Sequence, residues 1–164
     1  MNDKYLRSII YGGVDGIITI FNIISGVTGA QLDTKIIIIL GISSLFSDAV
    51  SMGMSDYLSL KANKKLDKDL DMDENTSSMI TFISFIIFGL IPLLTFIILL
   101  KMNQKNIFIK SLFATMVSLF ILGSYQSKIT KENYIKLGLT TSFHGLLASI
   151  VSYNIGKMIN SYLL

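Results

Sequence analysis

Five runs of mostly apolar residues take up most of the chain, and each is long enough to cross a lipid bilayer. A helix that spans the hydrocarbon core needs about 20 predominantly apolar residues. The runs are continuous, whereas the strands of a membrane barrel alternate apolar and polar residues over about ten positions. We therefore predict an all-α polytopic membrane protein with five transmembrane helices. They cover residues 9–30, 36–60, 79–100, 107–125 and 135–160.

The composition agrees with this class of protein. Charged residues make up 15% of the 164 residues, against roughly 25% in ordinary soluble domains. The chain contains no cysteine, which excludes a disulfide scaffold and a cysteine-ligated zinc or iron–sulfur site. The five runs leave room only for short connections. We expect one transmembrane domain over residues 1–164, with a short polar loop at 61–78.

The basic residues predict how the chain lies across the membrane. Nine of the 14 Lys and Arg residues lie on the side of the N-terminus, before the first run or near the connections after the second and fourth. Loops rich in Lys and Arg stay in the cytoplasm. We expect a cytoplasmic N-terminus and a lumenal or exterior C-terminus, in an intracellular membrane or in the plasma membrane. Membrane lipid is the expected partner, and nucleic acid is not, because the basic residues form no single soluble face.

Polar and small residues recur at helical spacing within the first run. Residues three and four positions apart fall on one face of a helix. Small residues four positions apart, such as Gly12 and Gly16 or Gly26 and Ala30, let two helices approach closely. This face can be a contact seam between helices or subunits, a polar pathway, or both. Its members are Gly12, Asp15, Thr19, Asn22, Gly26 and Gly29, with Gly16 as a further contact residue.

The second run carries two acidic residues near one stripe. Asp48, Met52 and Asp56 lie one turn apart, with Ser51 and Ser55 beside them. A carboxylate in mid-membrane costs about 2.5–3.5 kcal/mol on insertion scales, and such residues normally mark a pathway for ions or protons. The alternative is that these aspartates cap a helix or accept hydrogen bonds from neighbouring hydroxyls.

Three further features are candidates for metal chemistry. Met52 with neighbouring carboxylates forms a mixed soft and hard ligand set, which suits Fe(II), Co(II) or Mn(II) better than Mg(II) or Ca(II); packing is the alternative for a methionine. His144, the only histidine, can be a ligand, a proton carrier or a polar packing residue. The acidic segment 67–74 lacks the glycine and glutamate of an EF-hand loop. It is a solvated linker or a weak collector of cations.

These runs also resemble a known family. The stretch YGGVDGIITIFNIISGVTGA at 11–30 is similar to the first-helix signature of the vacuolar iron transporter family. The stretch LFSDAVSMGMSDYLSLKA at 45–62 resembles the second-helix pattern, and weaker resemblances follow in the right order over the rest of the chain. The short form resembles bacterial-type and nodulin-like members.

The resemblance implies a homodimer with five helices per subunit. The family moves Fe(II), and often Mn(II), from the cytosol into a vacuole-like or exterior compartment, usually by proton antiport. The metal ion is cargo, the proton is the coupling ion, and no tightly bound cofactor is implied. The pathway is expected between the subunits, along the first helices. By the matching motifs, Asp15 is the acidic pathway residue, Met52 is a ligand, and Asp48 matches an acidic position of the bacterial-type branch.

The chain also departs from the family pattern. It lacks the long cytoplasmic insertion that plant-type members carry after the second helix, Asp56 replaces a commoner Glu or Asn, and His144 stands where a small or aliphatic residue is expected. Two alternatives remain open, a passive cation channel on the same scaffold and a membrane structural or interaction protein that does not transport. No nucleophile–base pair and no phosphate-binding loop occurs in the sequence, so we do not expect an enzyme.

Overall fold

The computed structural model describes residues 5–66 and 72–163, and for residue 163 it describes the backbone alone. The described chain is helical without strands, and each of the five apolar runs is confirmed as a long helix. The second helix continues past the predicted end of its run, and the third begins within the predicted polar loop. The helices are α1 (Leu6–Gly29), α2 (Thr34–Leu66), α3 (Glu74–Lys101), α4 (Ile107–Tyr125), the short α5 (Ser127–Thr130) and α6 (Tyr134–Leu163).

Side chains just ahead of three helices accept hydrogen bonds from the first turn. Asp33 Oδ1 accepts from the backbone N–H of Lys35 at 2.8 Å at the start of α2. Asp73 caps α3, and Asn133 Oδ1 accepts from the N–H of Ile135 at 2.9 Å at the start of α6. Such caps satisfy backbone donors that have no partner within the helix. They explain why these helices begin where they do.

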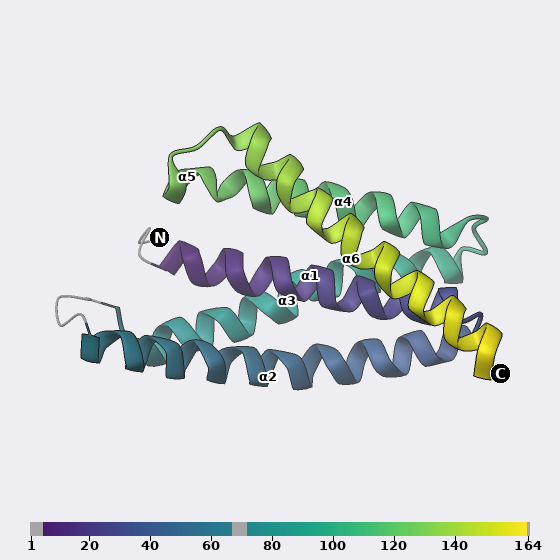
Figure 1. Ribbon diagram of the computed structural model, residues 1–164, viewed down its shortest axis with the longest axis horizontal. Coiled ribbons are helices and arrows are strands. Elements are labelled where there is room, and N and C mark those ends of the chain that lie inside the picture. Colours follow the sequence, from purple (N-terminus) through teal and green to yellow (C-terminus); the bar gives the residue numbers. More distant parts are fainter. Residues whose placement is uncertain (1–4, 67–71, 164) are drawn as a thin grey trace.

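The long helices form one elongated bundle in which helices that follow one another along the chain alternate in direction (Figure 1). Helices α1, α3 and α6 run one way, and α2 and α4 run the other. The start of α1, the short α5 and the beginning of α3 therefore lie at one end, and the C-terminus lies at the other. An odd number of long helices separates the two ends of the chain. The assignment of the N-terminal end to the cytoplasm stays a prediction.

Helix α1 forms the centre of the bundle, where it packs against α2, α3, α4 and α6. Its residues Ile17, Ile20 and Ile24 are fully buried. One hydrophobic cluster joins α1 to α2 and α3 through Phe21 and Phe85, and a second cluster joins α1 to α4. A helix that is buried on most sides is well placed to hold functional side chains on the side that remains open.

Backbone contacts at glycine bring α1 unusually close to α3 and α6. A methyl group on Gly16 would lie 2.4 Å from the carbonyl oxygen of Phe85, and one on Gly29 would lie 2.1 Å from that of Tyr153. Gly12 meets the carbonyl oxygen of Thr81 in the same way. The small residues of the first run are therefore helix contacts within the chain, as their spacing predicts.

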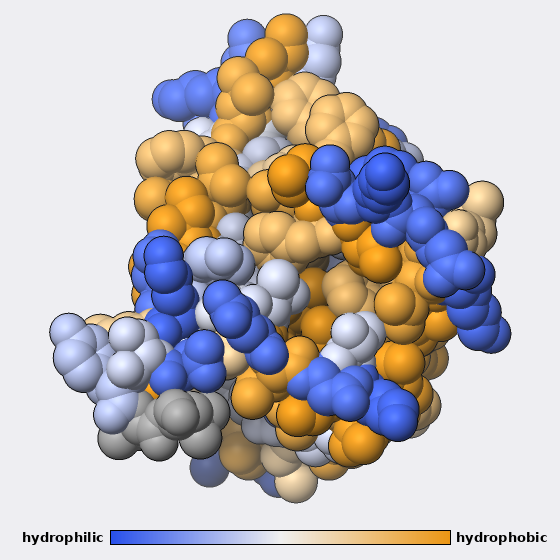
Figure 2. Space-filling view, turned by 90° about the vertical axis from the view of Figure 1, so that its right-hand side faces the viewer, coloured by the Kyte–Doolittle hydropathy of each residue, from blue (hydrophilic) through white to orange (hydrophobic). Residues whose placement is uncertain are grey.

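The outer surface has the distribution expected of a membrane protein. Four helices, α1 to α4, are long and apolar enough to cross a bilayer, with α4 counted through Thr130. Large apolar side chains such as Phe46, Ile87 and Phe113 are exposed along the outside of the bundle. Figure 2 looks at the end that holds the α1–α2 turn. Hydrophilic residues gather there in separate groups over a largely hydrophobic surface. The chain is an integral membrane protein with these helices as its membrane-spanning part.

Helix α6 is the exception to the predicted spans. It forms over the predicted range, but it is not apolar enough to qualify by composition with the other four. The residues that it buries are small, namely Gly138, Gly145, Ser149 and Gly156, and such residues add little to mean hydropathy. Its large apolar residues, including Leu139, Phe143 and Leu147, face outward instead. The crossing of α6 through the membrane stays a prediction that rests on its position beside α1 and α4.

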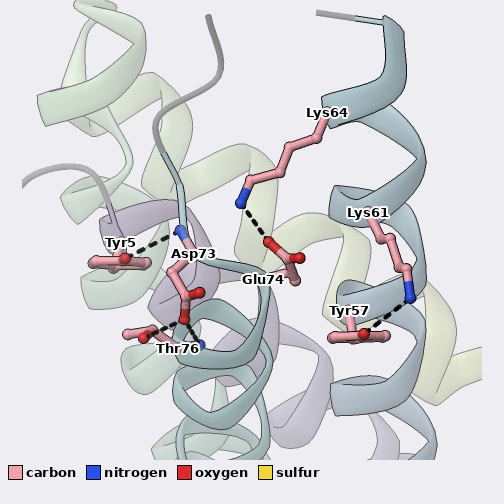
Figure 3. A network of polar contacts seen from close by, with 7 residues as sticks. All are labelled: Tyr5, Tyr57, Lys61, Lys64, Asp73, Glu74 and Thr76. Carbon is pink, nitrogen blue, oxygen red and sulfur yellow. Dashed lines mark hydrogen bonds and ion pairs between the residues drawn. The ribbon is translucent and has the colours of Figure 1, made fainter. Parts of the chain in front are cut away.

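Polar contacts tie the ends of α1, α2 and α3 together (Figure 3). Lys64 near the end of α2 pairs with Glu74 at the start of α3. Asp73 Oδ2 accepts from the N–H and from the hydroxyl of Thr76, both at 2.7 Å, and the N–H of Asp73 donates to the hydroxyl of Tyr5 at 3.4 Å. These contacts hold the α2–α3 connection close to the beginning of α1.

We predict that the Gly16→Ala variant is less stable than the wild type by about 1–3 kcal/mol, because the added methyl group must push α1 away from the backbone of α3. Thermal unfolding in detergent micelles measures this loss. Gly26→Ala is the matched control, because its methyl group lies 3.0 Å from the Ser152 hydroxyl and 3.7 Å from the nearest backbone oxygen, also of Ser152. Equal stability of the two variants would contradict the proposed role of the contact.

Candidate functional site

The polar face of α1 divides into a packed side and an open side. Gly12, Gly16 and Gly29 are buried, and their contacts are described above. Asp15, Thr19, Asn22 and Gly26 are only partly buried and border the outer surface of the subunit. The sequence predicts that this face is a contact seam, a polar pathway, or both. In the structure, the contacts and the open polar residues lie on different sides of the same helix.

Two cavities lie along the open side of α1, one toward each end. The first has a volume of about 520 Å³ and lies between α1, α5 and the first half of α6. Its polar lining consists of Arg7, Tyr11, Asp15, Gln126, Thr130 and Thr141. The second has a volume of about 590 Å³ and lies between α1, α2 and the second half of α6. Its polar lining consists of Thr19, Asn22, Ser44, Asp48 and Ser152.

The two aspartates of these cavities are electrostatic neighbours. Asp15 lines the first cavity and Asp48 lines the second, yet the Asp48 carboxylate lies close enough to repel the charge of Asp15. Ser47 Oγ donates to Asp48 Oδ1 at 3.4 Å. Two carboxylates that face open space from neighbouring helices can bind a cation, which would offset their mutual repulsion.

Asp56 lies in different surroundings. Its side chain is buried, and its Oδ2 accepts from Ser77 Oγ at 2.6 Å and from Thr81 Oγ1 at 3.0 Å. The hydroxyl of Ser77 lies 2.7 Å from that of Ser8, so this polar cluster joins α1, α2 and α3. The geometry corresponds to the alternative in which an aspartate bonds to neighbouring hydroxyls. Asp56 is not among the described residues that line either cavity.

Met52, Ser51 and Ser55 are not among the residues that line either cavity. Met52 is partly buried against the hydrophobic cluster of α1, α2 and α3, and neither cavity lining described above includes it. Ser51 and Ser55 are exposed, and Ser55 Oγ donates to the carbonyl oxygen of Ser51 at 2.8 Å. A ligand role for Met52 therefore needs its side chain to turn toward the aspartates.

The remaining sequence candidates lie away from both cavities. His144 is exposed on α6, with its ring 6.4 Å from that of Phe143 between centroids. In the acidic segment, residues 67–71 lie outside the described residues, while Asp73 caps α3 and Glu74 pairs with Lys64. Over residues 5–66 and 72–163, no three His, Asp or Glu side chains come together as a ready metal site.

Sequence reasoning missed part of the first cavity. Arg7 lies two turns before Asp15 on the same helix, so helical spacing could have found it. Gln126 lies between α4 and the short α5, and Thr130 is the last residue of α5, which the sequence does not predict as a separate helix. Only the packing of the bundle brings them beside α1.

We predict that Asp56→Ala destabilises the fold by about 1–3 kcal/mol, because the hydroxyls of Ser77 and Thr81 lose their acceptor in a buried site. Thermal unfolding in detergent is again the measurement. Asp56→Asn retains a carbonyl acceptor and should lose less stability. If Asp56→Ala unfolds at the wild-type temperature, the cluster is not structural.

The chain belongs to the VIT family, since the sequence model of that family matches residues 6–76 and 63–157. Among the similar proteins is a vacuolar iron transporter of Plasmodium falciparum (isolate 3D7), which is 26% identical, with 95% of this chain and 82% of the relative covered. A vacuolar iron transporter of Toxoplasma gondii (strain ATCC 50861 / VEG) is 24% identical, with 96% and 75% covered. The vacuolar iron transporter homolog 2 of Arabidopsis thaliana is 20% identical, with 97% and 86% covered.

The aligned lengths show where the chain differs from some relatives. The alignment with the Plasmodium falciparum protein extends over 225 positions, more than the 164 residues of this chain, so that relative has additional residues within the matched region. The alignment with the Arabidopsis thaliana homolog extends over only 171. The two family matches overlap at residues 63–76, the connection between α2 and α3. This agrees with the missing insertion that the sequence indicates.

Proposed function

We propose that this protein transports divalent metal, Fe(II) and also Mn(II), out of the cytosol by proton antiport. The observation that carries the proposal is the pair Asp15 and Asp48, which face open cavities on the polar side of α1. Relatives over nearly the whole chain are named vacuolar iron transporters. Neither carboxylate is needed for packing in the way that Asp56 is. An ionisable residue inside a membrane helix is normally kept for function.

The route follows from the order of the cavities along α1. The first cavity extends from Arg7 to Ile18, and the second begins at Thr19 and extends to Ala30. A cation that enters beside Asp15 meets Asp48 before it reaches the far end of the bundle. With the N-terminal end in the cytoplasm, this direction is export.

Competition between metal and proton supplies the coupling. A carboxylate binds metal in its ionised form, and a bound proton removes that charge, so metal and proton compete for the same oxygens. The same oxygens of Asp15 and Asp48 therefore hold either a divalent ion or protons. A gradient of one can drive the other in the opposite direction.

We propose further that the working unit is a homodimer. The described residues of one subunit supply two carboxylates to the open face and no cluster of three ligands. A second copy placed with its α1 against the first would double the number of carboxylates and close the open side from lipid. Met52 would be an additional soft ligand after rotation of its side chain.

We expect proteoliposomes with the wild-type protein and an acidic interior to take up Fe(II) or Mn(II) against the metal gradient. Asp15→Asn should abolish this uptake, because the amide carries no charge to bind metal or proton. Asp33→Asn is the matched control, since Asp33 is exposed in the α1–α2 turn and should leave uptake unchanged.

The same assay separates the alternatives. Uptake that persists after the pH gradient is collapsed, and only down the metal gradient, would indicate a passive cation channel. A folded protein that moves no divalent ion would contradict transport.

The absence of cysteine makes the dimer directly testable. Thr19→Cys places one thiol on the open side of α1, and a bifunctional thiol reagent should link two copies because the faces meet. Ile121→Cys on the exposed side of α4 is the control and should stay largely unlinked. Linking at Ile121 but not at Thr19, read on a denaturing gel, would place the interface elsewhere.

A further inference from the structure

An unpartnered oxygen lies in the middle of the polar face. Asn22 Oδ1 is buried and accepts no hydrogen bond from any residue in the described ranges. A buried acceptor without a partner costs about 1–3 kcal/mol. A leucine of similar shape would remove that cost, so packing alone does not explain an asparagine here. The buried oxygen of Asn22 therefore needs a partner that the described residues do not supply.

The surroundings of Asn22 indicate what this partner is. Asn22 lines the second cavity together with Asp48, Thr19 and Ser44. Each contributes oxygen, as a carboxylate, an amide or a hydroxyl. Neither Met52 nor His144 is among the residues that line this cavity. A donor set of oxygens that includes one negative charge suits a hard divalent cation such as Mn(II).

The wall that carries Asn22 is fixed by direct backbone packing. Ser152 Oγ on α6 donates to the backbone oxygen of Asn22 at 2.7 Å. One turn further along, a methyl group on Gly156 would lie 2.1 Å from the carbonyl oxygen of Gly26. Helices α1 and α6 therefore cannot move apart or slide without losing these contacts. The backbone of α1 at Asn22 is therefore held in place before any ligand arrives.

We propose that Asn22 and Asp48, with the hydroxyls of Thr19 and Ser44, form a second divalent-cation site in this cavity. Asn22 lies seven residues after Asp15, which is about 10 Å along the helix axis. The second site is therefore separate from the one at Asp15. The proposal rests on the proposed function, because it places two successive sites on the same route.

Asp48 connects the two sites. It lines the second cavity and also acts electrostatically on Asp15. A cation that leaves Asp15 thus moves toward a second carboxylate and an amide oxygen, without crossing a purely apolar stretch. Several weak sites in series allow an ion both to enter and to leave a pathway.

The test is Mn(II) binding to the purified full chain, measured by electron paramagnetic resonance in detergent without any gradient. In the Asp15→Asn background, Mn(II) binding should persist at the second site. Adding Asn22→Leu should weaken this remaining binding by about tenfold or more, because a coordinating oxygen is lost. Adding Asn154→Leu is the matched control, since the Asn154 amide bonds to the carbonyl of Ile150 and lies outside the cavity. It should leave binding unchanged.

A second variant at the same position distinguishes loss of the binding site from loss of folding. Asn22→Asp retains the oxygen and adds a charge, and it should bind Mn(II) about tenfold more tightly. Unchanged Mn(II) affinity in both Asn22 variants, or no Mn(II) binding at all in Asp15→Asn, would overturn the second site. Because the binding assay measures no transport, a folded wild-type protein that takes up no divalent metal in proteoliposomes would count against the proposed function and leave this binding result standing.

Discussion

The direct backbone contact of α1 with α3 and α6 is the interaction on which the rest of the structure depends. Glycines at 12, 16 and 29 let α1 approach the carbonyl oxygens of its neighbours without any intervening side chain. In a bilayer, such close packing has to replace the hydrophobic drive that joins helices in water. It also decides which side of α1 is buried, and therefore which polar residues remain on the open side.

The aspartates of the first two helices show two different outcomes for a carboxylate in a membrane protein. Asp56 is buried among hydroxyls, and its oxygen joins α2 to α3 and, through Ser77, to Ser8. Asp15 and Asp48 instead face cavities and act on each other through their charges. The first arrangement is a structural contact, and the second leaves the carboxylates at open space, as the proposed function requires. This difference, more than the number of acidic residues, supports transport along α1.

The short α2–α3 connection gives the chain a compact form within its family. The ion pair of Lys64 and Glu74 and the cap at Asp73 bring the two helices together directly. Relatives with additional residues in the matched region belong to the same family, and the polar face of α1 lies within the part that they share with this chain. The two carboxylates of the proposed pathway, Asp15 and Asp48, lie on the membrane helices α1 and α2.

The sequence by itself determined the helical class, the positions of the long helices and the polar face of α1, because apolar run length and helical spacing are local properties. It also pointed to Asp15 and Asp48, because a charged side chain inside an apolar run is costly in the membrane and is normally retained for function. Only the tertiary structure separated Asp56 from them, through hydroxyls that lie 21 and 25 residues further along the chain. It likewise brought α5 beside α1 and left the oxygen of Asn22 without a partner. These features arise from contacts between distant segments, and no local pattern encodes which helices meet.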